Sequence, residues 1–402
     1  MDNLAGRRIH DIGDGLGLDL GDEAGKFAVD LMQEVLILFG RKPRRHNKPT
    51  LIERGVVRQV IETRSFRQNL NYIGSKYKLA PWIVSQIKNT VGHDLKPFTA
   101  ADLFAGTGAV ARSLRPLMGH VTANDVEHYS YVLNRHYIGN GNLPDTTTLS
   151  DQLAALKPTK GLIFWNYCLG GGTGRRYFSD DNGQKLDAVR SQIELWKTTG
   201  AISDDVYYFL LTTLLESMDR VANTASVYAA FLKQLKKSAA NPFVWIPAAI
   251  ESDAPQGTVY QEDANLLIHR LQGDILYLDP PYNSRQYGSY YHLFNAITEY
   301  RQANLYGKTG MRPYFRSDYC RSRHAKGAIN ELIAAAKFRY IFLSYSNEGL
   351  LSLQDIADLL STFGTYQLVR KRHARFRADQ AQSRRHKASA TWEYLHILKK
   401  RI

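Results

Sequence analysis

Short apolar runs that end near an aspartate alternate with segments of helical periodicity in this chain. "AADLF" (100–104) and "HVTAND" (120–125) are typical of strands, and "GAVARSLRPL" and "YSYVLNRHYI" follow them as helices. Strands and helices that alternate in this way predict a parallel, doubly wound sheet. Strand-like runs appear again at "TVYQED" (258–263) and "DILYLDPPY" (274–282), and three more follow. The fold class indicated is α/β.

The middle of the chain interrupts this pattern. Residues 150–258 open with a glycine-rich loop and continue as a helical region from Asp187 to Lys237, with apolar residues at helical spacing. We interpret this interval as a helical domain inserted between two parts of one core, 67–149 and 259–402. Residues 1–66 form an extension of unknown role, which includes one stretch of helical periodicity.

Charge is the informative bulk property. The formal net charge is +14, which predicts a polyanionic partner, nucleic acid or an anionic membrane surface. Residues 370–387 hold eight Lys or Arg against one Asp, so this stretch carries half of the surplus. It lies between two strand-like runs, which predicts a positive hairpin tip, and no amphipathic helix carries the charge, which favours nucleic acid. A second basic patch lies at 41–48. An ordinary solvated loop explains this patch as well as contact with a polyanion does.

Other bulk features bear on location. Cys168 and Cys320 lie far apart, which suggests neither a disulfide framework nor a zinc site. The opening "MDNLAGRRIH" has no apolar core of the kind that secretory signals carry. No apolar run approaches the roughly 20 residues that cross a bilayer. A cytoplasmic protein without a membrane partner is therefore expected.

Two candidate ligand motifs follow the first two strands. In open parallel sheets, ligands bind beyond the carboxyl ends of the strands. "DLFAGTGAV" places Asp102, Phe104 and Gly106 at the first of these ends, where glycines allow close approach of a ligand, although a tight turn alone would explain them. Asp125 ends the second strand, where a carboxylate suits a ribose diol. No lysine-containing phosphate loop is present, so a nucleoside without a triphosphate fits better.

The run "LDPPY" (278–282) is the most specific motif. Proline fixes its own φ and biases the preceding residue to extended geometry, so Asp279, Pro280 and Pro281 form a rigid strand end. The Asp279 carboxylate and nearby carbonyls form a cluster of acceptors, and Tyr282 adds a flat face. Acceptors beside a ring suit a planar base with an exocyclic amine, because they offset the positive charge that grows as the amine attacks. An ordinary Asp-Pro turn is the alternative.

At this point the chain resembles the Dam-like adenine-N6 DNA methyltransferases, in which S-adenosylmethionine donates the methyl group. The resemblance covers about 67–402 and depends on motifs in order: "NYIGSK" (71–76), "FAGTG" (104–108), Asp125, Asp263 and "DPPY" (279–282). Two further segments are similar to modification enzymes of restriction systems: the residues that follow "DPPY", and "YFSDDNGQKLDAVRSQIELW" (177–196) in the inserted interval. The resemblance implies a Rossmann-like methyltransferase sheet with an inserted helical target-recognition domain.

The resemblance also implies residue roles. Tyr72 and Lys76 would border the cofactor, with Lys76 near its carboxylate. Asp102 would lie near its amino group, and Phe104 and Gly106 beside it. Asp125 would bind the ribose hydroxyls and Asp263 the cofactor adenine. The catalytic set would be Asp279, Pro280, Pro281 and Tyr282, with Asp279 touching both the cofactor and the target amine and Tyr282 stacking on the target base.

The expected partner is double-stranded DNA whose target adenine is rotated out of the helix. Arg175 and Arg176 are candidates for reading guanine, although a solvated loop explains them as well. Four arginines of the hairpin tip are more suited to holding phosphates: Arg375, Arg377, Arg384 and Arg385. A monomer, a separate cognate restriction endonuclease and no metal are expected. An RNA adenine methyltransferase and a non-catalytic DNA-binding protein are the alternatives.

Overall fold

The computed structural model describes residues 70–401 except 142, 226, 252–253 and 375–389. Seven strands form one sheet in the order β3-β2-β1-β4-β5-β7-β6. All neighbouring strands are parallel except β7, which runs antiparallel to both β5 and β6. The strands are β1 (Thr99–Asp102), β2 (His120–Asn124), β3 (Thr258–Tyr260), β4 (Gln272–Leu278), β5 (Lys337–Ser346), β6 (Gly364–Ala374) and β7 (Ala390–Lys400). The α/β prediction is confirmed, and each strand lies within or around a run that the sequence indicated.

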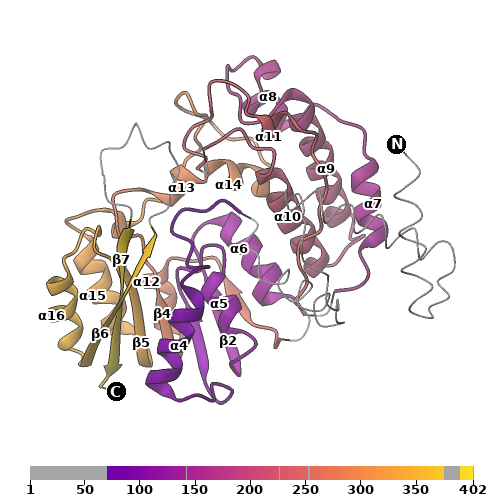
Figure 1. Ribbon diagram of the computed structural model, residues 1–402. Coiled ribbons are helices and arrows are strands. Elements are labelled where there is room, and N and C mark those ends of the chain that lie inside the picture. The colour runs from indigo at the N-terminus through magenta and orange to yellow at the C-terminus, as the bar shows by residue number, and fades with distance from the viewer. Residues whose placement is uncertain (1–69, 142, 226, 252–253, 375–389, 402) are drawn as a thin grey trace, which may run out of the picture. The chain divides into compact units, whose positions relative to one another are not determined.

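Helices cover both faces of this sheet (Figure 1). One face packs against α4 (Ala80–Val91) and α5 (Ala109–Leu114), and the other against α12 (Ala264–Leu267), α15 (Ala325–Ala335) and α16 (Leu353–Ser361). Strand β4 shows why both faces are closed: Ile275 and Tyr277 belong to the first core, while Leu276 and Leu278 belong to the second. A parallel strand buried on both sides reads as a continuous apolar run.

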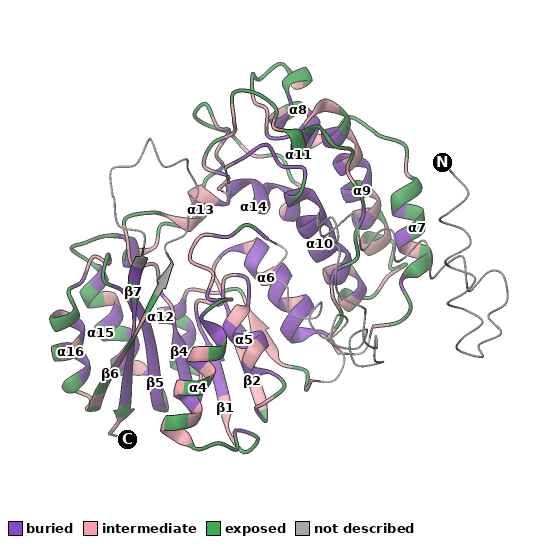
Figure 2. Ribbon diagram, viewed as in Figure 1, coloured by how far each residue is buried: buried purple, intermediate pink, exposed green. Residues whose placement is uncertain are grey.

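A third hydrophobic core lies among the helices of the middle of the chain and their neighbours. The remaining helices are α6 (His128–Asn134), the π-helical turn η1 (Arg135–Gly139), α7 (Thr147–Ala155), α8 (Leu162–Tyr167), α9 (Asp180–Thr198), α10 (Asp204–Asp219), α11 (Lys237–Ala240), α13 (Tyr287–Tyr290) and α14 (His292–Glu299), with 3₁₀ turns at η2 (Leu169–Gly171), η3 (Ile268–Arg270) and η4 (Asp318–Cys320). Residues of α6, α9, α10 and α14 share this core; α6, α10 and α14 are largely buried in Figure 2, whereas α9 is buried along only part of its length. The inserted interval therefore packs against helices from outside it.

The helical region expected over 187–237 differs in detail. It is divided between α9 and α10, and helix ends at Asp219 rather than near Lys237, apart from the single turn of α11. Gly200 lies in the break with φ +70°, a backbone conformation that favours glycine. Ser203 then caps α10 by accepting a hydrogen bond from the Val206 N–H. Helical periodicity thus predicts the two helices, whereas Gly200 and the Ser203 cap are the local signals that divide them.

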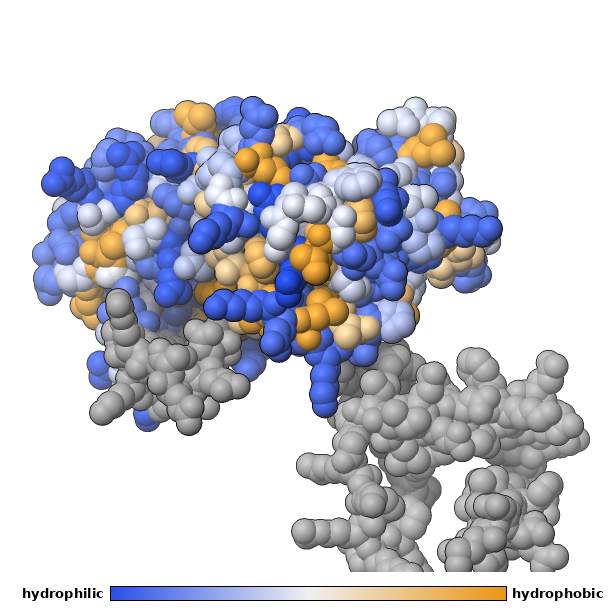
Figure 3. Space-filling view, turned by 90° about the horizontal axis from the view of Figure 1, so that it is seen from above, coloured by the Kyte–Doolittle hydropathy of each residue, from blue (hydrophilic) through white to orange (hydrophobic). Residues whose placement is uncertain are grey.

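The surface seen from above is mostly hydrophilic, with hydrophobic residues in separate patches (Figure 3). Among the described residues, none of the helices combines the length and apolar character needed to cross a bilayer. The extension 1–66 and its expected helix lie outside the described residues.

Candidate active site

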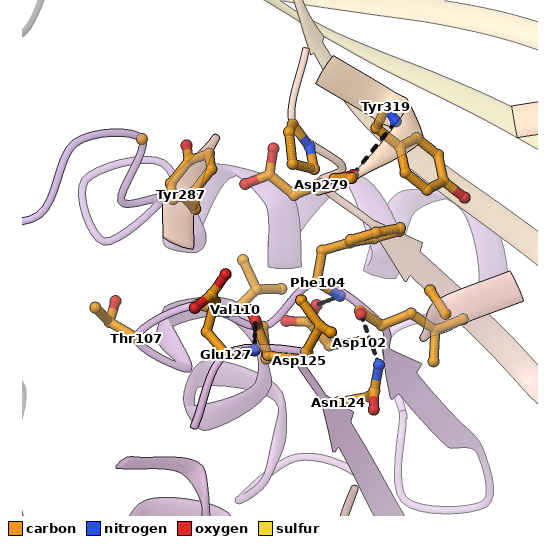
Figure 4. Close-up of a pocket in the computed structure, with 18 of the residues that line it drawn as sticks. Asp102, Phe104, Thr107, Val110, Asn124, Asp125, Glu127, Asp279, Tyr287 and Tyr319 are labelled. Atoms are coloured by element: carbon orange, nitrogen blue, oxygen red, sulfur yellow. Dashed lines mark hydrogen bonds between the residues drawn. The ribbon is translucent and has the colours of Figure 1, made fainter. Parts of the chain in front are cut away.

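A pocket lies at the carboxyl ends of β1, β2 and β4 (Figure 4). Its empty space, open solvent at the mouth included, is about 900 Å³. Nine residues that the sequence singled out line it together: Tyr72, Lys76, Asp102, Phe104, Gly106, Asp125, Asp263, Asp279 and Pro281. They come from positions up to 209 residues apart, so the fold brings into one pocket the residues that separate motifs singled out.

The loop between β1 and α5 depends on its glycines. Gly106 and Gly108 have φ of +52° and +76°, where a side chain would strain the backbone. A Cβ at position 108 would also lie 2.6 Å from Oδ1 of Asn134. The Gly106 N–H donates to Asp125 at 2.8 Å and its carbonyl accepts from Ser130 Oγ at 2.6 Å. These contacts hold the loop as one wall of the pocket.

Two carboxylates follow β2. Asp125 accepts hydrogen bonds from the backbone N–H groups of Gly106 and Glu127, and burial raises its pKa. Glu127 also lines the pocket and accepts a hydrogen bond from Asn295 Nδ2 at 2.6 Å. Burial and the charge of Asp125 raise the pKa of Glu127 to about 7. No sequence motif pointed to Glu127.

Aromatic rings connect the pocket to the helical core. The Tyr72 ring stacks on Tyr291, with centroids 4.4 Å apart and an interplanar angle of 22°. Its hydroxyl lies 2.8 Å from that of Tyr129. Burial raises the pKa of Tyr72 well above the ordinary tyrosine value, so this hydroxyl stays protonated. These contacts of Tyr72 therefore fix the "NYIGSK" segment between the pocket and the helical core.

Another wall combines Phe104 with residues 315–319, which no sequence motif singled out. Tyr319 packs edge-on against the Phe104 ring at 5.0 Å, and Phe315 and Ser317 line the same wall. Asp263 caps α12 by accepting from the N–H groups of Asn265 and Leu266, both through Oδ1. Its second oxygen, Oδ2, makes neither of these contacts.

A buried charge cluster surrounds the strand end that carries "DPPY". The Lys76 ammonium lies 2.8 Å from Asp279 Oδ1 and 3.2 Å from Glu393 Oε1. Burial lowers the pKa of Lys76, but the charges of Asp279 and Glu393 more than reverse this, so its pKa lies well above the usual value. Burial and the charge of Asp279 raise the pKa of Asp102 well above its ordinary value.

Tyr282 lies beside this cluster rather than among the residues that line the pocket. Its ring packs edge-on against Tyr345 at 5.7 Å, and the Lys76 ammonium is 5.5 Å from its centroid. Its carbonyl accepts a 2.7 Å hydrogen bond from the Leu350 N–H. Pro280 is also absent from the pocket lining.

The arginines proposed for DNA contact fall into two groups. Arg175 already donates to the main-chain carbonyls of Asn166, Gly307 and Lys308, and Arg176 donates to the carbonyl of Lys233. A role in base reading would require these bonds to be shared or exchanged. The tip of the β6–β7 hairpin, with Arg375, Arg377, Arg384 and Arg385, lies outside the described residues. Its two strands pair antiparallel up to Ala374 and Ala390, as expected for a hairpin.

One more basic segment lies at residues 301–323, which no sequence motif singled out. Residues 301–323 carry six Lys or Arg against one Asp. Arg316 and Arg323 are exposed, and in the described part of the chain neither has an acidic partner at ion-pair distance. This segment also supplies the wall residues Phe315 and Tyr319, so positive charge lies next to the pocket.

Comparison with known proteins identifies the family. Residues 72–359 match the D12 class of N6 adenine-specific DNA methyltransferases. The chain belongs to this family. It is 53% identical over 332 residues to the Type II methyltransferase M.NlaIII of Neisseria lactamica, which covers 82% of this chain and 99% of that protein.

More distant relatives of the D12-class chain are also modification enzymes. The Type II methyltransferase M.CviAII of Paramecium bursaria Chlorella virus 1 is 36% identical over 77% of this chain and 93% of its own. M.FokI of Planomicrobium okeanokoites is 33% identical over 83% of this chain and 53% of its own. The resemblance inferred from the motifs is confirmed: this is an adenine-specific DNA methyltransferase, its substrate is DNA, and the family uses S-adenosylmethionine.

Proposed function

We propose that this chain transfers a methyl group from S-adenosylmethionine to N6 of an adenine that is rotated out of duplex DNA at a specific site. The observation that carries the proposal is the pocket that brings Asp102, Asp125 and Asp263 together with Asp279. Separate carboxylates are available for the amino group, the ribose and the adenine amine of one elongated nucleoside ligand. The volume, about 900 Å³ with open solvent included, is within the ~300–1,000 Å³ typical of ligand sites.

The residues present fit this cofactor chemically. Phe104 offers an aromatic edge for the adenine, and the Asp125–Glu127 pair offers acceptors for ribose hydroxyls. Bound S-adenosylmethionine supplies the electrophilic methyl group. The protein's part is to hold the amine in line with it, since positioning alone contributes much of the acceleration in such displacements.

Asp279 is the proposed acceptor for the target amine. It is held at a strand end by Pro280 and Pro281, and the Lys76 ammonium keeps an opposite charge 2.8 Å away. A rigid acceptor stabilises the charge that grows on N6 without reorganising during reaction. Asp279 and its flanking carbonyls orient the amine, and Tyr282 supports the base.

Tyr282→Ala is expected to weaken binding of target DNA by about 10-fold, because stacking a base on an aromatic ring is worth roughly 1–3 kcal/mol. Fluorescence of 2-aminopurine at the target position measures rotation of the base, and the variant should show a smaller increase on binding. Tyr282→Phe keeps the ring and serves as the matched control, so it should behave like the parent. An unchanged signal in Tyr282→Ala would remove the stacking role.

DNA contact is proposed for three regions. The inserted interval 150–258 would recognise the target sequence, and the tip of the basic hairpin 370–387 would hold phosphates. The exposed cations of 301–323 would add phosphate contacts beside the pocket, where a rotated base must enter. Because the relatives are Type II modification enzymes, we propose that a separate restriction endonuclease cuts the same site and that this chain acts as a monomer.

Long-read sequencing of DNA from cells that express the protein tests the proposal. The expected result is N6-methyladenine in one recurrent sequence context, absent from cells that express Asp279→Ala. Methyl incorporation into duplex DNA and into folded RNA, compared in parallel, separates the DNA enzyme from an RNA enzyme on the same fold. Absence of methylated adenine together with retained DNA binding would favour a non-catalytic protein.

A further inference from the structure

Glu393 is a buried carboxylate on β7 that no sequence motif singled out. It is 2% exposed and points to the Lys76 ammonium at 3.2 Å. In the sheet its register partners are Ser346 on β5 and Lys371 on β6. The Lys371 ammonium lies over the Trp82 ring at 5.7 Å. Among the described residues, Lys76 is thus the cation at ion-pair distance from Glu393.

The cluster holds more negative than positive charge. Asp279 and Glu393 both contact the single ammonium of Lys76, so the three groups carry one uncompensated negative charge when all are ionised. Burial raises the pKa of Asp279 despite the adjacent Lys76, and burial raises the pKa of Glu393 to about 7. The folded chain therefore holds this surplus charge at a cost, because buried unpaired charge is unfavourable.

A stable protein would avoid such a surplus unless a ligand neutralised it. The pocket that contains Asp279 and Lys76 is the proposed cofactor site, and the methyl group must be delivered to an amine held by Asp279. The sulfonium that carries this methyl is therefore a cation close to the cluster. The product, S-adenosylhomocysteine, has a neutral thioether at the same position.

We propose that Glu393 sets the charge of the active site for a cationic cofactor, so that the chain binds S-adenosylmethionine in preference to its neutral product. The inference rests on the proposed function and deepens it. Glu393 acts through Lys76 as a positioning residue: it balances Lys76, which leaves the charge of Asp279 available to the sulfonium and the target amine. When the methyl group is transferred, the S–C bond breaks, the N6–C bond forms and the positive charge passes from sulfur to N6, from which it leaves as a proton released to solvent. The surplus negative charge of the cluster then returns and weakens the hold on the product.

Calorimetric binding of both nucleosides to the full chain tests the proposal. In Glu393→Gln, which removes the charge and keeps the shape, the preference for S-adenosylmethionine over S-adenosylhomocysteine should fall about 10-fold. Glu251→Gln is the matched control, because it removes another carboxylate, half-buried and paired with Arg112, and neither of these residues lines the pocket. Its preference should match the parent's.

A merely structural role for Glu393 predicts a different result. If Glu393 only held Lys76 in place, both ligands would lose affinity in parallel and their ratio would stay constant, which would overturn the proposal. Failure of the parent chain to bind either nucleoside would overturn the proposed function instead. The two failures are therefore distinguishable.

The pH dependence of the same ratio gives a second measurement on the unmodified chain. Glu393 is neutral below and charged above its raised pKa, so the preference should rise with pH through about 7. The other titratable groups that face it are Lys76, Asp279, Tyr282 and Lys371. Of these, Lys76 and Tyr282 have raised pKa values well above this range, so neither changes charge near pH 7.

Glu127 needs its own control, since its pKa is also raised to about 7. Glu127 lies beside Asp125 at the proposed ribose site, and the ribose is common to both ligands, so its effect cancels in the ratio. The rise with pH should therefore persist in Glu127→Gln and disappear in Glu393→Gln. A rise that persists in Glu393→Gln would contradict the assignment even if the affinity ratio changes.

Discussion

Asp279→Ala should abolish methyl transfer while duplex DNA and the cofactor still bind. Removing one preorganised group that stabilises developing charge typically costs about 10²–10³-fold in rate, and Asp279 is the only carboxylate of the "DPPY" strand end. The variant should nevertheless fold, because Lys76 keeps Glu393 at 3.2 Å and the cluster loses its surplus charge. Incorporation of labelled methyl groups into target duplex in a single turnover measures the effect.

Asp274→Asn is a matched control for this change. Asp274 lies on the same strand, but it accepts hydrogen bonds from the N–H and hydroxyl of Thr99 at the opposite end. Its replacement should leave the methyl-transfer rate within a few-fold of the parent. If Asp279→Ala still methylates DNA at the parental rate, the assigned role of the carboxylate is wrong. Loss of DNA binding together with activity would point to misfolding instead.

The strand ends could be predicted from sequence because they obey local rules. A buried parallel strand is a short apolar run, and a polar residue marks where it leaves the core, as Asp102 and Asp125 do. Proline makes the end of β4 still easier to place. Since parallel strands expose their carboxyl ends at one edge, the sequence alone predicts that these motifs meet in one site.

Other parts of the site depend on contacts between distant segments. Glu393 is the acidic residue in the largely apolar run of β7, and the pairing of β7 with β5 brings it near Lys76. An ionisable residue in such a run is itself a signal of function. The sequence does not indicate, however, that Lys76 is its partner. Tyr319 carries no motif at all, and it reaches the pocket because the chain after α14 returns across Phe104.

The helical part shows the same limit. Periodicity predicted α9 and α10, yet the core that they enter also contains α14, which begins ten positions after Tyr282, the last residue of "DPPY". Sequence alone assigned those residues to the catalytic half of the chain. Hydrophobic spacing identifies a buried helical face, but not the element that covers it.

Lys76→Met should destabilise the chain by about 3–5 kcal/mol and remove activity, since taking away one partner of a buried ion pair leaves the other charge uncompensated. Here two carboxylates, Asp279 and Glu393, would lose their common cation. Methionine retains the length and apolar character of the lysine stem, so packing is largely preserved. Urea unfolding followed by circular dichroism measures the loss.

The pH dependence of this loss distinguishes charge from packing. A carboxyl whose folded pKa is raised binds its proton more tightly in the folded than in the unfolded state, so it stabilises the fold at low pH, and this stabilisation is lost as pH rises through the folded pKa. Burial already raises the pKa of Glu393 to about 7 with Lys76 present. The deficit of Lys76→Met should therefore shrink from pH 8 to pH 5.5, and Lys76→Met combined with Glu393→Gln should recover part of it at pH 8. A deficit that is constant over this range, and unaffected by the second substitution, would mean that Lys76 contributes by packing rather than by its charge.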